Sequence, residues 1–228
     1  MIKTVLIDLD DTIFDFKSCE KLALSRSLDR FSIAYCDEML HRYSVINDAM
    51  WKKLERGEIT REVLRVHRFE LFLREYGVSD ISFDSFADTY ADELKNTGVL
   101  LPGAEELLAD LSKQYALYAV TNGYVDTQMG RIRTAGIRKY FKEIFISQLV
   151  GYVKPSKGFF DHCKEKIGFE LSETVLIGDS LTSDIRGGVD YGIYTIWFNP
   201  HGLTSDLVSP NAQVHSLSEI PGLLLSLR

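Results

Sequence analysis

Residues 5–12 read VLIDLDDT, a run of apolar residues followed closely by three acids. The apolar run predicts a buried strand over Thr4–Leu9, so the acids stand at the end of a strand that belongs to the core. Like charges crowded at the edge of a core are unfavourable unless a positive group lies among them. The stretch therefore predicts a site at which carboxylates gather around a cation.

Further short apolar runs predict four more strands, and helical patterns separate the later ones. The strands are expected at Ala116–Thr121, Ile144–Ser147, Thr174–Ile177 and Thr195–Phe198. The helices are expected at Gly103–Gln114, Asp126–Ala135, Lys157–Ile167 and Ser183–Tyr191. Strands that are almost wholly apolar and alternate with helices are typical of a parallel sheet buried on both faces. The predicted fold class is α/β.

The interval 17–96 breaks this alternation, because it carries only helical patterns. About 80 residues are too many for a simple crossover between two strands. We therefore expect an inserted all-helical domain at 17–96, with the α/β core formed by 1–16 and 97–228. Within the insertion, Arg61, Arg65 and Arg68 follow a helical spacing, which predicts a solvated basic face. The alternative is that Arg68, or Trp51 or Phe14 near the hinge, contacts the base or ribose of a substrate.

Composition narrows the class of partner. The chain of 228 residues has a net charge of −7 and no basic block, which disfavours nucleic-acid binding. Cys19, Cys36 and Cys163 show neither metal-ligand spacing nor a disulfide framework, which favours a reducing compartment. We see no signal peptide and no apolar run near the ~18 residues of a membrane span. We expect a cytoplasmic protein without a membrane partner, either a monomer or a homodimer.

Polar side chains gather where the predicted strands end, which is where sites form in open α/β sheets. Strand one ends in the segment that carries Asp8, Asp10 and Thr12, and strand two ends in Thr121 and Asn122. Lys154 follows strand three, and Asp179, Ser180 and Asp184 stand at and after the end of strand four. If strand four lies beside strand one, these side chains form a single constellation.

The constellation suits phosphoryl transfer. Asp8, Asp10 and Asp179 offer the hard oxygen ligands that Mg²⁺ prefers. Lys154 and Thr121 can donate to phosphate oxygens. An aspartate beside Mg²⁺ and lysine stays ionised and can attack phosphorus, so we assign Asp8 as nucleophile. Asp10 is close enough to act as general acid and base.

These segments resemble the four ordered motifs of the haloacid dehalogenase superfamily. The matching segments are residues 8–12, Thr121-Asn122, Lys154-Pro155, and Gly178-Asp179-Ser180 with Asp184. The resemblance implies a Rossmann-like core with a helical cap inserted just after the first motif. It also implies that Asp8 is the nucleophile and Asp10 the general acid and base. Members that break carbon–halogen bonds lack an acid at the position of Asp10, so its presence implies a phosphatase.

The resemblance extends to the other motif residues. It implies that Thr121, Asn122 and Lys154 bind phosphate, with Lys154 also aiding catalysis. It implies Mg²⁺ ligands at Asp8, at Asp10 through its backbone carbonyl, and at Asp179. Supporting roles are implied for Asp184, Ser180 and Thr12. Asp11 stands where many relatives carry glycine and is expected to affect only the loop.

Longer strings resemble the pyrimidine 5′-nucleotidase branch of the superfamily. They are ISQLVGYVKPSKGFF (146–160), GDSLTSDIRGG (178–188) and TNGY (121–124). The substrate so implied is a nucleoside 5′-monophosphate. Phosphatases for phosphoglycolate or sugar phosphates, and phosphomutases, share much of the pattern and remain alternatives. A non-catalytic binding protein is a further alternative, although no motif acid is missing. The Gly187-Gly188 pair inside a helical pattern predicts close packing of that helix on the sheet.

Overall fold

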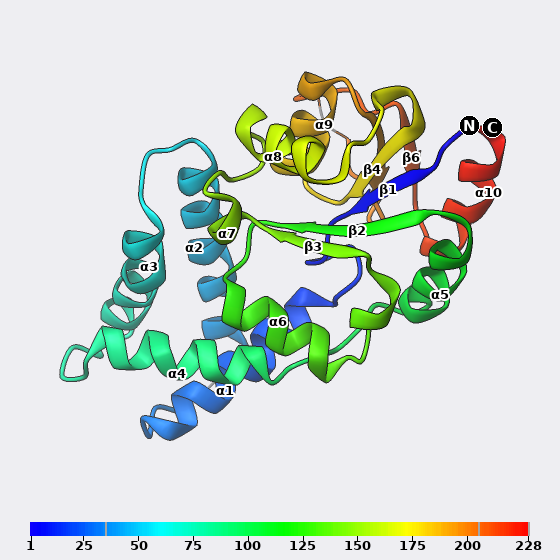
Figure 1. Ribbon diagram of the computed structural model, residues 1–228. Helices are drawn as coiled ribbons and strands as arrows, with labels where there is room; N and C mark the ends of the chain where they lie inside the picture. The colour runs from blue at the N-terminus through cyan, green and yellow to red at the C-terminus, as the bar shows by residue number, and fades with distance from the viewer. Residues whose placement is uncertain (35, 205, 228) are drawn as a thin grey trace. The chain divides into compact units, whose positions relative to one another are not determined.

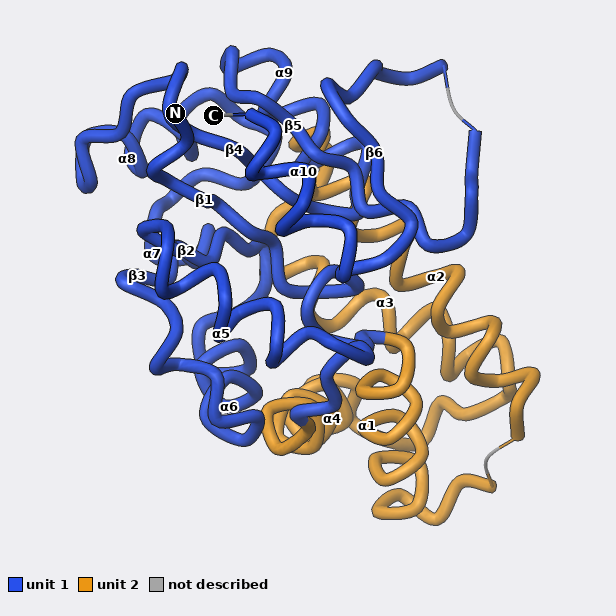
Figure 2. The backbone as a smooth tube through the Cα atoms, turned by 90° about the vertical axis from the view of Figure 1, so that its right-hand side faces the viewer, with its two compact units in different colours: residues 1–16, 98–228 blue, residues 17–97 orange. Residues whose placement is uncertain are grey.

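The computed structural model describes residues 1–34, 36–204 and 206–227. The chain divides into two compact units, shown in different colours in Figure 2. Unit 1 comprises residues 1–16 and 98–228, and unit 2 comprises residues 17–97. Among the described residues, no helix is both long and apolar enough to span a bilayer.

Unit 1 is built on a parallel sheet of six strands, which confirms the predicted α/β class (Figure 1). The strands are β1 Thr4–Ile7, β2 Ala116–Thr121, β3 Glu143–Ile146, β4 Thr174–Gly178, β5 Tyr194–Phe198 and β6 Ala212–Val214. Their order across the sheet is β3-β2-β1-β4-β5-β6. The edge strand β6 was not predicted, because three residues are too few to show an apolar pattern.

The first strand lies in the interior of the sheet, between β2 and β4. Ile7 is in register with Ala119 on one side and with Ile177 on the other. The register continues past the strand, since the Asp8 amide donates to the Ile177 carbonyl at 2.9 Å. The carboxyl ends of β2, β1 and β4 are therefore adjacent, which is the arrangement the predicted constellation requires.

Helices cover both faces of this sheet (Figure 1). They are α5 Ala104–Gln114, α6 Val125–Thr134, α7 Ser147–Val150, α8 Lys157–Ile167, α9 Arg186–Tyr191 and α10 Ile220–Ser226. Val5 and Ile7 pack in one cluster with residues of α5, α6 and α10, whereas Leu6 packs with Phe159 and Phe160 of α8. Successive side chains of β1 thus enter opposite layers, and full burial of each such side chain contributes about 1.5–3 kcal/mol.

The helix predicted at 183–191 is formed in two parts. A π-helical turn, Leu181–Ile185, comes first and continues directly into α9. The Ser180 hydroxyl caps the turn by accepting from the Ser183 amide at 3.3 Å. The apolar pattern predicted a helix here, but it did not predict that the first turn is irregular.

The described part of unit 2 contains helices and no strand. The helices of this region are α1 Phe16–Arg30, α2 Asp37–Glu55, α3 Arg61–Glu75 and α4 Phe83–Lys95. Thr60 caps α3 by accepting from the Val63 amide at 3.4 Å. Gly57 and Gly77 follow α2 and α3 with φ of 70° and 74°, a backbone that glycine adopts without steric strain.

The basic face predicted on α3 is wrong for Arg68. Its side chain is buried, donates to the Asn47 Oδ1 at 2.7 Å and lies 4.7 Å from the centre of the Phe69 ring. Arg65 does lie at the surface, where it pairs with Asp84. Arg68 therefore belongs to the interior of unit 2, and the helical spacing alone could not distinguish the two environments.

The two segments that lead into and out of unit 2 pair with each other. The Leu101 amide donates to the Ile13 carbonyl at 2.9 Å, and the Asp15 amide donates to the Val99 carbonyl at 3.1 Å. Between these two bonds, Phe14 and Leu100 form an antiparallel bridge. The insertion therefore leaves and re-enters unit 1 through a short two-stranded ribbon.

Gly188 shows why glycine is tolerated inside α9. A Cβ atom at this position would lie 2.4 Å from Thr195 Cγ2 and 3.0 Å from Leu176 Cδ2, both on the sheet. The helix can approach the strands this closely only because Gly188 has no side chain. The predicted close packing is confirmed.

We expect Gly188→Ala to lower the free energy of unfolding. The gain in helix propensity is about 1 kcal/mol, but overpacking a rigid interior costs about 1–3 kcal/mol, and contact with the buried Thr195 places this site at the upper end. Urea unfolding would measure the change. Gly222→Ala in α10 is the matched control, because nothing lies within 4 Å of its added Cβ. Equal stabilisation by both substitutions would contradict the packing explanation.

Candidate active site

A buried ammonium stands at the centre of the clustered strand ends. The Lys154 side chain is 1% exposed, and its Nζ donates to Asp8 Oδ1 at 2.6 Å, Asp184 Oδ1 at 2.6 Å and the Val120 carbonyl at 2.7 Å. These bonds use all three ammonium hydrogens. Burial opposes the charge, but the carboxylates of Asp184 and Asp8 outweigh it and raise the pKa of Lys154. The lysine is therefore held as a cation.

Three carboxylates surround this cation. Oxygens of Asp8, Asp179 and Asp184 all lie within 4.8 Å of one another. Burial raises the pKa of Asp179 well above its usual range, and the carboxylates of Asp8 and Asp184 raise it further. Burial likewise raises the pKa of Asp8; Lys154 opposes this shift and Asp184 adds to it. One ammonium thus pairs with two of the three clustered acids, Asp8 and Asp184.

This donor set fits Mg²⁺. The ligand atoms are carboxylate oxygens, which hard cations prefer, and a divalent ion would balance the two negative charges that Lys154 leaves uncompensated. The sequence had assigned Asp8, Asp10 and Asp179 to the metal. In the structure, the Asp184 carboxylate joins Asp8 and Asp179, so it lies nearer the centre than a supporting role had suggested.

Asp184 can reach the cluster because Gly178 leaves room for it. A Cβ atom on Gly178 would lie 2.4 Å from Asp184 Cγ. The second Asp184 oxygen accepts from the Ser180 amide at 3.2 Å. The hydroxyl of Thr12, fully buried, lies 3.5 Å from Asp179 Oδ1. The residues predicted to support the site, Thr12, Ser180 and Asp184, are therefore all brought beside it.

Asn122 holds the backbone of the lysine. Its Oδ1 accepts from the Lys154 amide at 2.8 Å, and its Nδ2 donates to the Lys154 carbonyl at 2.9 Å. The side chain thus joins the loop after β2 to the loop that carries Lys154. The contact of Thr121, Asn122 and Lys154 with phosphate stays a prediction; Thr121 lies at the end of β2 and is 1% exposed.

Asp10 faces a different set of partners from Asp8. Gln128 Nε2 donates to Asp10 Oδ2 at 2.8 Å, and Arg131 Nη1 donates to Asp10 Oδ1. Both partners come from α6, and sequence reasoning missed them. Their signal is a glutamine and an arginine three residues apart, on the helix that follows the Thr121-Asn122 turn.

Asp11 shapes the loop that leads from these acids to α1. Its φ is 55°, in the left-handed region that glycine enters freely and aspartate tolerates. Its Oδ1 accepts from the Phe16 amide at 3.1 Å, at the first residue of α1. Asp11 thus adopts a backbone conformation that glycine would also adopt, and it holds the start of α1 through its side chain.

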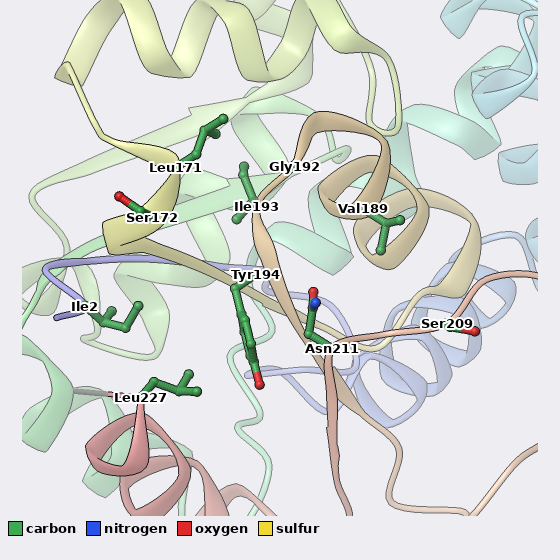
Figure 3. Close-up of a pocket in the computed structure, with 10 residues that line it drawn as sticks. All are labelled: Ile2, Leu171, Ser172, Val189, Gly192, Ile193, Tyr194, Ser209, Asn211 and Leu227. Atoms are coloured by element: carbon green, nitrogen blue, oxygen red, sulfur yellow. The ribbon is translucent and has the colours of Figure 1, made fainter.

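A separate hollow of about 580 Å³ lies at the other end of the strands (Figure 3). Its lining includes Tyr194, the first residue of β5, and Leu171 and Ser172, which precede β4. Asn211 Oδ1 at its wall already accepts from the Thr195 amide and hydroxyl. Among the described residues that line the hollow none is charged, so it does not suit a phosphate ester.

Comparison with known proteins agrees with this geometry. Residues 2–192 match the family described as haloacid dehalogenase-like hydrolase. The chain is 37% identical over 222 residues to the pyrimidine 5′-nucleotidase PynA of Streptococcus pneumoniae, covering 96% of this chain and 93% of the relative. It is 34% identical over 239 residues to the N-acylneuraminate-9-phosphatase of Mus musculus, covering 99% and 95%.

A solved structure is also similar over almost its whole length. The HAD-hydrolase YfnB of Bacillus subtilis, described as bound to magnesium and as revealing interdomain movement, is 36% identical with a TM-score of 0.92. The match covers 98% of each chain. The fold and its close relatives are thereby established.

We expect Asp179→Asn to stabilise the metal-free protein. The raised pKa of Asp179 means that its ionised form is held unfavourably in the folded state, and removing that charge should raise the free energy of unfolding by about 1–2 kcal/mol. Urea unfolding in the presence of a chelator measures this change. Added Mg²⁺ should then stabilise the original chain more than the variant, because ligand binding favours the folded state.

The matched control is Asp190→Asn, the same substitution at an exposed position of α9. It should change the free energy of unfolding by less than about 0.5 kcal/mol under either condition. If Asp179→Asn instead destabilised the chelated protein, the crowding of carboxylates would not be the dominant force at this site.

Proposed function

Because the chain belongs to the haloacid dehalogenase-like hydrolases and is a phosphatase of that family, we propose that it hydrolyses nucleoside 5′-monophosphates, pyrimidine ones in particular, with Mg²⁺ as cofactor. The observation that supports this chemistry is that two neighbouring acids have different hydrogen-bond partners. Asp8 faces the Lys154 ammonium, whereas Asp10 faces Gln128 and Arg131. Two carboxylates in different surroundings can take different roles in one reaction.

In the first step, an Asp8 oxygen attacks phosphorus and the bond to the ester oxygen breaks. Asp10 gives its proton to that oxygen, so the nucleoside leaves as a neutral alcohol. An aspartyl-phosphate remains on Asp8. Lys154, 2.6 Å from Asp8, stabilises negative charge on the transferring group, and the Thr121 hydroxyl donates to a phosphate oxygen.

In the second step, a water molecule attacks phosphorus and gives a proton to Asp10. The bond between phosphorus and Asp8 breaks, which releases inorganic phosphate and restores the Asp8 carboxylate and the proton on Asp10. About a third of the Asp10 side chain, 32%, is exposed, so the ester oxygen and the water can both reach it. A single proton on Asp10 therefore serves both steps.

Asp8 and Asp179, with the backbone carbonyl of Asp10, are the proposed Mg²⁺ ligands, and Asp184 lies beside them. Bound there, Mg²⁺ would neutralise the clustered acids and polarise a phosphate oxygen. YfnB, which was solved with magnesium, supports this cofactor.

The substrate class rests on the relatives. PynA, named as a pyrimidine 5′-nucleotidase, supports a nucleotide, and unit 2 is the cap that would close over it and exclude bulk water. The interdomain movement described for YfnB supports such closure. The relative named N-acylneuraminate-9-phosphatase supports the alternative of a sugar phosphate.

Asp8→Asn should abolish turnover, with at least about a 10³-fold loss in kcat for a nucleoside monophosphate, since an amide cannot replace the attacking carboxylate. Phosphate release measures the rate. Asp11→Asn is the matched control: it makes the same change three residues away, in a loop position that asparagine also adopts, and should leave kcat nearly unchanged.

The same assay tests the cofactor. A chelator should stop turnover, and excess Mg²⁺ should restore it. Activity that survives in Asp8→Asn would contradict the assignment of Asp8 as nucleophile. Turnover that is unchanged by a chelator would contradict the assignment of Mg²⁺ as cofactor.

A panel of phosphomonoesters at fixed Mg²⁺ tests the substrate. We expect kcat/KM for UMP, CMP or their deoxy forms to exceed that for phosphoglycolate, glyceraldehyde 3-phosphate and N-acylneuraminate 9-phosphate by at least about 10-fold, the discrimination that a few pocket contacts provide. Preference for any of these three over every nucleotide would reject the nucleotidase assignment. It would leave the phosphatase chemistry intact.

A further inference from the structure

Arg131 fixes the direction of a buried hydrogen-bond chain. Its guanidinium, 1% exposed, lies 4.2 Å from the centre of the Phe14 ring and can only donate. One of its nitrogens donates to Asp10 Oδ1 and, at 3.0 Å, to Gln128 Oε1. Since this contact needs an acceptor, the oxygen of the Gln128 amide must face Arg131 and its nitrogen must face the other way.

The Gln128 amide nitrogen then joins two residues of the site. It donates to Asp10 Oδ2 at 2.8 Å and to Thr121 Oγ1 at 2.7 Å, which uses both of its hydrogens. Thr121 Oγ1 also accepts from the Gly123 amide at 3.2 Å. With both lone pairs of the hydroxyl so occupied, its own hydrogen is left to donate elsewhere. Gln128, 1% exposed, thus orients both side chains.

The chain leaves space for this glutamine at Gly123. A Cβ atom there would lie 2.6 Å from Gln128 Cγ and 2.8 Å from its Cδ. Gly123 does not have a positive φ, so an alanine would fit the backbone and displace only the flexible Gln128 side chain. The third residue of the TNG string therefore acts on Asp10 through Gln128.

We propose that Gln128 and Arg131 are positioning residues that hold Asp10 in place for proton transfer to the leaving group. This inference rests on the function proposed above. Each Asp10 oxygen accepts from one of the two, and both donors stand on a helix that packs in the core of unit 1. General acid–base catalysis contributes about 10²–10⁴-fold, and a misplaced group loses much of it.

A leaving-group series separates this role from a structural one. Substituted phenyl phosphates share one size but differ in how much the departing oxygen needs a proton. Asp10→Asn should lower kcat/KM most for phenyl phosphate and least for 4-nitrophenyl phosphate. We expect Gln128→Met, which keeps the volume but removes the amide, to lose about 10–100-fold on phenyl phosphate and less than about 3-fold on 4-nitrophenyl phosphate.

Two further variants guard against misfolding. Gly123→Ala should cause the same larger loss on phenyl phosphate than on 4-nitrophenyl phosphate, because it displaces Gln128. Arg131→Gln should do so as well, because the Gln128 amide is then free to turn. Arg133→Gln is the matched control, because it removes an exposed arginine from the same helix and should leave the series unchanged. Thermal unfolding of each variant checks that the protein is folded.

The outcomes distinguish this proposal from the one it rests on. If Asp10→Asn lowered kcat/KM equally for every ester, the acid–base role of Asp10 would be overturned, and this inference with it. The positioning role alone would be overturned by a different result. In it, Asp10→Asn loses most on phenyl phosphate, but Gln128→Met and Gly123→Ala lose equally on every ester or lose nothing.

Discussion

The ammonium of Lys154, buried among acids, is the interaction on which the site depends. Its three bonds reach β1 through Asp8, β2 through the Val120 carbonyl, and the turn after β4 through Asp184. Removing one partner of a buried pair typically destabilises a protein by about 3–5 kcal/mol, because the remaining charge is left uncompensated. The lysine therefore holds three strand ends together as well as having a role in the proposed chemistry, and Asn122 fixes its backbone.

The net charge of this cluster determines what else it can bind. Three carboxylates and one ammonium leave the cluster negative, and this imbalance makes a divalent cation a natural component. Such an arrangement is unfavourable for the protein alone and favourable for ligand binding, as is common where function and stability compete. The neighbouring Asp10 escapes the imbalance, because its carboxylate has its own arginine.

Much of this could be predicted from the sequence. Apolar runs located five of the six strands, and the acids, Thr121 and Lys154 at their ends marked the site. Strand order could not be derived from periodicity, because an apolar run does not say which neighbour it will pair with. Gln128 and Arg131 were missed for a related reason: a polar residue on a helix is usually solvated, and only tertiary packing buries these two. Arg68 was predicted to lie on a solvated face for the same reason.

Several glycines mark places where another side chain passes. At Gly178 it is the Asp184 carboxylate, at Gly123 it is the Gln128 side chain, and at Gly188 it is Thr195 on the sheet. None of the three has a positive φ, so conformational freedom is not the reason for them. A motif glycine can thus be read as the space that a functional side chain needs, which is information that the motif letters alone do not carry.

The ribbon formed by Ile13–Asp15 and Val99–Leu101 has a consequence for how such a chain can change over time. The two ends of the insertion are held side by side, so to unit 1 the whole of 17–97 is a single loop. Closing a loop twice as long costs only about 0.6 kcal/mol more. Helices can therefore be added, lost or exchanged in this loop while β1 keeps its register, and the residues at the strand ends can be inherited independently of the inserted helices.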